Sequence, residues 1–134
     1  MSAIANQTVS LPDVELTCLT SPSIDDHDRP LVICVHGFPD SAYSWRYVMP
    51  ALEDAGFRVA APFIRGYAPS TVSGSGAYQT GASALDACAL HEHFGGDHRA
   101  VLIGHDWGAP IVYGAASIEP TRWAKVIAMA VPPG

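Results

Sequence analysis

The residues with the clearest chemical meaning form the pentapeptide Gly104-His105-Asp106-Trp107-Gly108, in which an aspartate stands midway between two glycines. Apolar runs precede and follow it, so we expect it to join a buried strand to a buried helix. The pattern is that of a nucleophile elbow, a tight strand-to-helix turn that exposes its central residue, although the elbow more often holds serine. Alone, the same five residues would also suit a plain turn in which Asp106 caps the helix.

A carboxylate in this position favours one kind of chemistry. Aspartate is already an anion at neutral pH, whereas a serine hydroxyl needs a base before it can attack. Attack on an acyl carbon would give an anhydride, an unfavourable resting point, but attack on a saturated carbon gives an ordinary ester. A water activated by a histidine can then hydrolyse that ester at the carbonyl of Asp106. The residue type therefore predicts epoxides or alkyl halides as substrates.

A second motif, His36-Gly37-Phe38-Pro39, directly follows the apolar run 31–35. Ester hydrolysis needs backbone N–H groups directed at the developing oxyanion. Behind a nucleophile elbow, one donor belongs to the residue after the nucleophile, here Trp107, and the other to a loop after an earlier strand, here Phe38. Two such motifs in this order are hard to explain by chance, so we predict an oxyanion hole formed by the N–H groups of Phe38 and Trp107.

The elements that must position these motifs follow from the apolar pattern. Residues 8–20 alternate loosely and predict two short strands at an antiparallel edge. Short continuous apolar runs are typical of strands that are covered on both faces. Runs of this kind predict four more strands, at 31–35, 58–64, 100–104 and 124–131.

Three helices are expected between these strands. One has Pro50 in its first turn and stops at Gly56, one spans 80–94, and an almost wholly apolar one spans 107–118. The second helix should bury one face, consisting of Ala82, Leu85, Cys88 and Ala89. The alternation of strands and helices predicts the α/β class, with a mostly parallel sheet and helices on both faces.

The composition narrows the class of protein. The chain has 134 residues, 15% of them charged, and a formal net charge of −6. Only seven residues are lysine or arginine, too few to favour nucleic acid, where affinity comes from neutralised phosphates. No apolar run approaches the roughly 18 residues that span a membrane, and the start of the chain has no signal-peptide pattern. We therefore expect no nucleic-acid and no membrane partner.

The cysteines and histidines give no sign of a metal or a cofactor. The three cysteines are odd in number and lack C-x-x-C spacing, which favours free thiols and a cytoplasmic location. The cluster His91-Glu92-His93 with Asp97-His98 lacks the H-E-x-x-H spacing and lies across a predicted helix end. We expect neither a metal site nor a cofactor.

Taken together, the motifs resemble the epoxide hydrolase branch of the α/β hydrolases. The resemblance runs from about residue 30 to the end and includes Tyr43-Ser44-Trp45-Arg46 and Arg65-Gly66-Tyr67. It implies that Asp106 is the catalytic nucleophile, that Phe38, Pro39 and Trp107 line the substrate pocket, and that the Phe38–Pro39 peptide is cis. Structural roles at the site fall to His36, Gly37, Gly104, His105 and Gly108.

Two departures bear on the substrate. The family usually has Asp where this chain has Phe63 and Gly where it has Ala68, so the loop near the pocket is expected to be reshaped. Haloalkane dehalogenases also resemble this chain, but they often hold the departing halide with an Asn at the position of Phe38. Phe offers no such donor, which favours a small apolar epoxide over a haloalkane.

The chain order of such sites is nucleophile, acid, histidine, yet no histidine follows Asp106 and the only later acid is Glu119. Family members are about twice as long and carry a helical cap and late strands. We therefore expect residues 1–134 to be the N-terminal part of a single core domain, with strands 1–6 and no internal boundary. A C-terminal half, as a continuation or a second chain, would supply the base, acid and cap. The alternative is a non-catalytic fragment or binding scaffold of the same fold.

Overall fold

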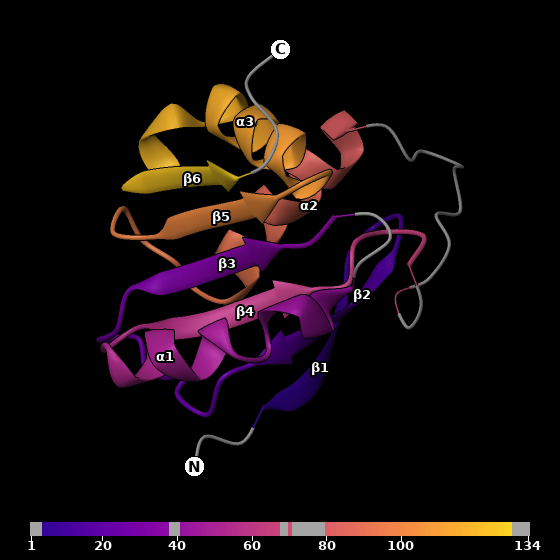
Figure 1. Ribbon diagram of the computed structural model, residues 1–134. Coiled ribbons are helices and arrows are strands. Elements are labelled where there is room, and N and C mark those ends of the chain that lie inside the picture. Colours follow the sequence, from indigo (N-terminus) through magenta and orange to yellow (C-terminus); the bar gives the residue numbers. More distant parts are fainter. Residues whose placement is uncertain (1–3, 38–40, 68–69, 71–79, 130–134) are drawn as a thin grey trace.

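The computed structural model describes residues 4–37, 41–67, 70 and 80–129 (Figure 1). Within these residues the chain forms a six-stranded sheet, three α-helices and two short 3-10 helices. The strands are β1 (Ala5–Ser10), β2 (Glu15–Thr20), β3 (Leu31–Val35), β4 (Arg58–Pro62), β5 (Val101–His105) and β6 (Lys125–Met129). The helices are η1 (Ala42–Trp45), α1 (Val48–Asp54), α2 (Thr80–His93), α3 (Gly108–Ile118) and η2 (Pro120–Arg122).

The sheet has the strand order β1-β2-β4-β3-β5-β6. β1 and β2 form an antiparallel hairpin that joins β4, and the remaining pairs are all parallel. The pairing confirms the predicted α/β class and the antiparallel edge. Because β3, β5 and β6 run in one direction, their carboxyl ends lie at the same edge of the sheet (Figure 1).

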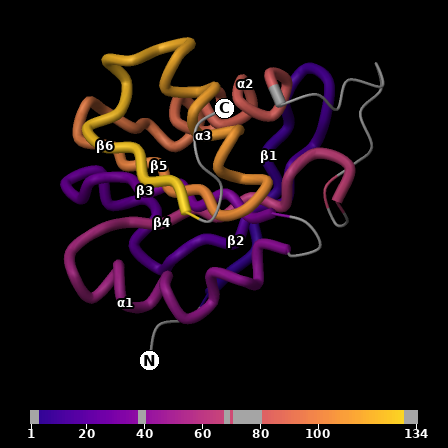
Figure 2. Tube along the Cα trace, turned by 45° about the horizontal axis from the view of Figure 1, so that its top comes forward, coloured from indigo at the N-terminus to yellow at the C-terminus, as the bar shows by residue number. Residues whose placement is uncertain are grey.

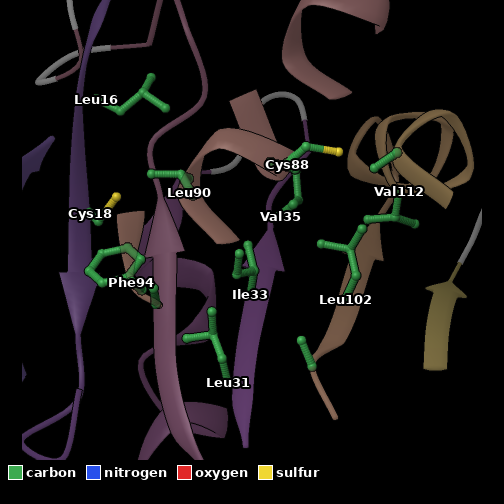
Figure 3. Packing of buried hydrophobic residues seen from close by; sticks show 14 of the residues in the cluster. Leu16, Cys18, Leu31, Ile33, Val35, Cys88, Leu90, Phe94, Leu102 and Val112 are labelled. Atoms are coloured by element: carbon green, nitrogen blue, oxygen red, sulfur yellow. The ribbon is translucent and has the colours of Figure 1, made fainter. Parts of the chain in front are cut away.

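Helices cover both faces of the sheet, as Figures 1 and 2 show: α2 and α3 lie on one side and α1 on the other. The alternate residues of β3 enter two separate cores. Ile33 packs with α2 and α3 in a cluster that includes Leu90 and Val112 (Figure 3), whereas Cys34 packs with Met49 of α1. The full burial of β3 explains why its sequence is a continuous apolar run rather than an alternating one.

Helix α1 begins at Val48, which puts Pro50 in its first turn as predicted. Two other sequence-based details differ from the structure. The strand predicted over 58–64 ends at Pro62. Leu85 of α2 is 56% exposed, and the buried face is formed by Ala84, Ala87, Cys88 and His91. Small alanines define no strong apolar face, so the packing of α2 against α3 decides the orientation.

Strand β6 is covered on one face only. Val126 and Ala128 pack against the core beneath α2 and α3, while Ile127 and Met129 are 43% and 40% exposed on the other face. Its outer edge has no pairing strand among the described residues. In that same part of the chain, no helix combines the length and apolar character that crossing a membrane requires.

Candidate active site

The two predicted motifs meet where the strand order of the sheet reverses. β4 pairs with one side of β3 and β5 with the other, which makes the junction of β3 and β5 a topological switch point. Ligands of open α/β sheets bind outside the carboxyl ends of the strands at such a point. His36 and Gly37 directly follow β3, and Asp106 directly follows β5.

Asp106 has a backbone conformation that side chains rarely adopt. Its φ is 57°, and it is the sole non-glycine residue with a positive φ in the described part of the chain. Its N–H donates to the carbonyl of Met129 at 3.0 Å, and its carbonyl accepts from the N–H of Ala109 at 3.0 Å. Strain of about 1–3 kcal/mol persists only where the surroundings enforce it. Here β6 and the start of α3 enforce it, as expected for a nucleophile elbow.

The flanking glycines are required because backbones approach closely. A Cβ on Gly104 would collide with the carbonyl oxygen of Gly108, and a Cβ on Gly108 would collide with that of Val35. A Cβ on Gly37 would lie 2.6 Å from Cβ and 2.8 Å from Oδ2 of Asp106. The Asp106 side chain therefore packs directly against the backbone of Gly37, where no other side chain would fit.

The carboxylate of Asp106 is not saturated by its neighbours. Its Oδ2 is buried and has no hydrogen-bond partner among the described residues. Structural carboxylates in protein interiors are normally bonded to donors, because a buried acceptor without a partner costs about 1–3 kcal/mol. An oxygen held in this state keeps its lone pairs available for an electrophile.

Trp107 follows Asp106 as the N-cap residue of α3, and its side chain is 61% exposed. The first N–H groups of a helix have no partners within the helix and favour an anion nearby. The start of α3 is therefore a suitable place for one backbone donor to an oxyanion on Asp106.

His36 is 1% exposed and both of its ring nitrogens have partners. Nε2 lies 3.1 Å from the backbone nitrogen of Ile64, and Nδ1 lies 2.9 Å from the carbonyl oxygen of Gly37. The rings of Phe63 and Tyr67 meet it edge-on, with centroids 6.4 Å and 5.1 Å away. These contacts are compatible with the structural role that the sequence predicts for His36, which stays a prediction.

His105 lies on the α1 side of the sheet, beside the elbow. Its side chain lines a cavity of about 340 Å³. The same cavity is lined by His36, Ser44, Trp45, Val48 and Met129.

The sequence analysis missed the support that Arg65 provides. Arg65 is 7% exposed; its Nε and Nη2 donate to the two carboxylate oxygens of Asp86 at 2.7 Å and 2.8 Å, and its Nη1 donates to Asp13 at 2.8 Å. These bonds, those to Asp86 foremost, raise the pKa of Arg65. They anchor the loop after β4 to α2 and to the β1–β2 turn. The spacing of Asp13, Arg65 and Asp86 in the sequence does not predict these ion pairs.

Tyr67, in the same loop, lies close enough to Asp106 to be affected by its charge. Burial raises the pKa of its hydroxyl, and the negative charge of Asp106 raises it further. The Arg65-Gly66-Tyr67 motif thus brings a tyrosine next to the site, a placement that its sequence context does not reveal.

Some of the predicted site lies outside the described residues. Phe38 and Pro39, for which the sequence predicts a cis peptide, belong to that group, as does Ala68. Phe63, where the family usually has Asp, is 2% exposed, and its ring meets Tyr43 edge-on at 5.4 Å as well as His36.

The histidine cluster near the end of α2 is held by protein groups. His91 lies 3.0 Å from the carbonyl oxygen of Asp97 and 2.8 Å from Nη1 of Arg122. Glu119 pairs with the same Arg122, at the far end of α3 from Asp106. Among the described residues, no group of three or more histidines, cysteines or carboxylates has a metal-binding arrangement.

The model of the α/β hydrolase fold family matches residues 30–134. Epoxide hydrolase A of Mycobacterium tuberculosis is 45% identical over 77% of this chain and 32% of its own length. Epoxide hydrolase B of the same organism is 41% identical over 80% of this chain and 30% of its own length. The chain thus spans about a third of the length of these relatives.

Solved structures agree with this result. The crystal structure of epoxide hydrolase A from Mycobacterium thermoresistibile superposes with a TM-score of 0.88 at 38% identity. The superposition covers 98% of this chain and 40% of that one. An epoxide hydrolase from an endophytic Streptomyces gives a TM-score of 0.86 at 35% identity.

Proposed function

Because the chain belongs to the α/β hydrolase fold family, we propose that it supplies the nucleophile of a hydrolase that opens epoxides through a covalent ester on Asp106. One observation carries the proposal: an aspartate with a φ of 57° at the switch point of the sheet, with a buried carboxylate oxygen that no described residue bonds. The names of the relatives support an epoxide as substrate.

The first step forms the ester. A carboxylate oxygen of Asp106 attacks a ring carbon of the epoxide, the carbon–oxygen bond of the ring breaks, and the ring oxygen leaves as an alkoxide that takes up a proton. The strain of the three-membered ring drives the opening. The carboxylate needs no base for this step because it is already ionised at neutral pH.

The second step returns the enzyme to its starting state. A water that has lost its proton to a histidine base attacks the carbonyl carbon of the ester. The resulting oxyanion is stabilised by the N–H groups of Phe38 and Trp107, the second of which lies at the N-terminus of α3. Collapse of this intermediate releases the diol and frees Asp106. Overall, one epoxide and one water give one diol.

The base, its acid partner and the cap are proposed to come from a C-terminal half, as a continuation of the chain or as a second polypeptide. Residues 1–134 would then be the N-terminal part of a single core domain. The exposed face of β6 and the limited share of the relatives that the chain matches support this view. The pocket, formed with Phe38, Pro39 and Trp107, would accept a small apolar epoxide.

We place this activity in the cytoplasm. Cys18, Cys34 and Cys88 are buried free thiols, which suits a reducing compartment. Burial raises the pKa of Cys18 and Cys34 to about 12, so neither is a reactive thiolate at neutral pH.

A chimaera tests the proposal. Residues 30–134 replace the matching segment of epoxide hydrolase A from Mycobacterium tuberculosis, and diol formation from a small apolar epoxide is measured. Asp106→Asn should abolish turnover, whereas Asp54→Asn, at the exposed end of α1, should retain it.

Three outcomes would contradict this assignment. Normal turnover by the Asp106→Asn variant would show that Asp106 is not the nucleophile. Halide release from a chloroalkane without diol formation would favour a haloalkane dehalogenase-type reaction. An inactive, well-folded chimaera would favour a non-catalytic scaffold.

A further inference from the structure

The buried histidine of α2, His91, is held in one tautomer. The residue is 5% exposed, and both ring nitrogens face protein groups. The group facing Nδ1 is the guanidinium of Arg122, at 2.8 Å, which can only donate, so Nδ1 accepts and carries no proton. The group facing Nε2 is the carbonyl oxygen of Asp97, at 3.0 Å, which can only accept, so Nε2 carries the proton. The contacts of the ring therefore require its neutral form.

The ring has little room to turn away from Arg122. A Cβ on Gly96 would lie 2.7 Å from Cδ2 and 2.8 Å from Nε2 of His91, so the backbone of Gly96 packs directly against the ring. The N–H of Gly96 also donates to the carbonyl of His91 at 2.8 Å. Trp123 meets the imidazole edge-on, with the ring centroids 5.0 Å apart. A proton added at Nδ1 would thus leave two cations facing each other in a buried place, without the bond that joins them.

Titratable and charged groups surround the ring and its partner on every side. They are Glu92 and Cys88 of α2, Asp97 and Arg99 of the next turn, Arg122 of η2 and Glu119 at the end of α3. Burial has the largest influence on the imidazole and lowers its pKa; Arg122 acts in the same direction, and the bond to Asp97 and the nearby carboxylates oppose it. Bonds from Arg99 lower the pKa of Asp97 to about 2, and burial raises the pKa of Cys88. Of these groups, a histidine is the one whose charge changes close to neutral pH.

The partner of His91 belongs to η2, the short helix between α3 and β6. Arg122 also bonds Glu92 at 2.8 Å, so two of its contacts reach α2. Two residues further on, the N–H of Ala124 donates to the carbonyl of Ala100 at 2.7 Å, directly before β5 and β6 pair. Nε1 of Trp123 is buried without a hydrogen-bond partner among the described residues, so its indole is held there by packing. The bond between His91 and Arg122 therefore helps to hold the connection between α3 and β6 against α2.

We propose that His91 is a pH-sensitive switch: the neutral ring holds η2 on α2 through Arg122, and protonation releases the connection between α3 and β6. In the open state water surrounds the imidazole, which then takes up a proton with its ordinary affinity. The closed state disfavours that proton. The bond therefore contributes fully above roughly pH 6.5 and its contribution is lost as the pH falls below that value. The switch is independent of the proposed function, because no reacting group takes part in it.

Hydrogen exchange at the Ala124 amide measures this opening. In the 134-residue chain, the opening constant should rise roughly 5- to 10-fold between about pH 7.5 and about pH 5.5, after correction for the intrinsic exchange rate. His91→Asn keeps an acceptor near the position of Nδ1 but cannot take up the proton, so most of this rise should disappear. His98→Asn, at an exposed histidine of the next turn, is the matched control and should retain it. An opening constant that does not change with pH in the unsubstituted chain, or a full rise in His91→Asn, would overturn the proposal.

A second measurement needs no variant. Nitrogen-15 NMR of the histidine rings at roughly pH 6.5 should show His91 mostly neutral, with the proton on Nε2 and none on Nδ1. The opposite tautomer would contradict the bond to Arg122. A doubly protonated ring while the Ala124 amide stays protected would show that the fold tolerates the charge, and the proposal would be wrong. Neither measurement depends on epoxide turnover, so failure of the proposed function would leave both results valid.

Discussion

Two buried histidines of this chain stand in contrasting surroundings. His36, at the carboxyl end of β3, lies within hydrogen-bond distance of the backbone groups of Gly37 and Ile64. It stands beside Asp106, which has a positive φ and a buried carboxylate oxygen that no described residue bonds. His91, near the end of α2, bonds the carbonyl of Asp97 and the guanidinium of Arg122, which in turn bonds Glu92 and Glu119.

The difference separates a reactive region from a structural one. Around His91 the charges are paired, the ring packs edge-on against Trp123 at 5.0 Å, and burial lowers the pKa of the imidazole. Such a cluster fastens η2 to α2 and leaves little capacity for a ligand. Asp106, by contrast, has a positive φ and a buried carboxylate oxygen that no described residue bonds. We therefore expect changes at the elbow to act on chemistry and changes at the His91 cluster to act on stability.

The largest effect is expected for Gly37→Ala. The new Cβ would lie 2.8 Å from Oδ2 of Asp106, so the carboxylate or the loop must move. A displacement of this size near reacting atoms should lower kcat in the chimaera by about 100-fold. Gly81→Ala is the matched control, because nothing lies within 4 Å of its Cβ. It should leave kcat unchanged. Equal activity of the two variants would show that catalysis does not require the close contact between Gly37 and the Asp106 carboxylate.

A smaller effect, and on a different property, is expected for Arg122→Met. The change leaves Nδ1 of His91 buried without its donor, which should lower the free energy of unfolding by about 1–3 kcal/mol. Urea unfolding of the chain measures this loss, and kcat in the chimaera should stay within twofold, roughly, because Asp106 is not touched. Arg99→Met, at an exposed ion pair, should destabilise less. A strong loss of kcat for Arg122→Met would contradict the claim that the His91 cluster affects stability and not catalysis.

Most of the fold could be predicted from the sequence because the strands in the middle of the sheet are covered on both faces. Leu31–Val35 is predicted to the residue, since its apolar run has no competing interpretation. Leu85 was assigned to the wrong face because a helix rich in alanine carries little directional pattern. The elbow was recognisable because its glycines and aspartate are contiguous in sequence.

The supports of the site could not be predicted in the same way. Arg65 bonds residues 52 and 21 positions away, and His36 bonds a backbone group 28 positions away. Backbone partners carry no residue-type signal, and ion pairs between distant residues become visible only when the chain is folded. The His91 cluster shows the converse: its adjacent histidines and carboxylates resemble a ligand set in the sequence, but in the structure His91 and Glu92 are partners of Arg122.

The most direct test of a covalent ester on Asp106 is to trace the source of the oxygen atom that is added to the epoxide. The chimaera, in molar excess over the epoxide, is allowed a single turnover in water labelled with oxygen-18, and the diol and the peptide that contains Asp106 are analysed by mass spectrometry. A covalent ester on Asp106 predicts an unlabelled diol and a labelled Asp106 carboxylate, because the added oxygen of the product comes from the enzyme. A labelled diol with an unlabelled Asp106 would mean that water attacks the epoxide directly, and would contradict the account.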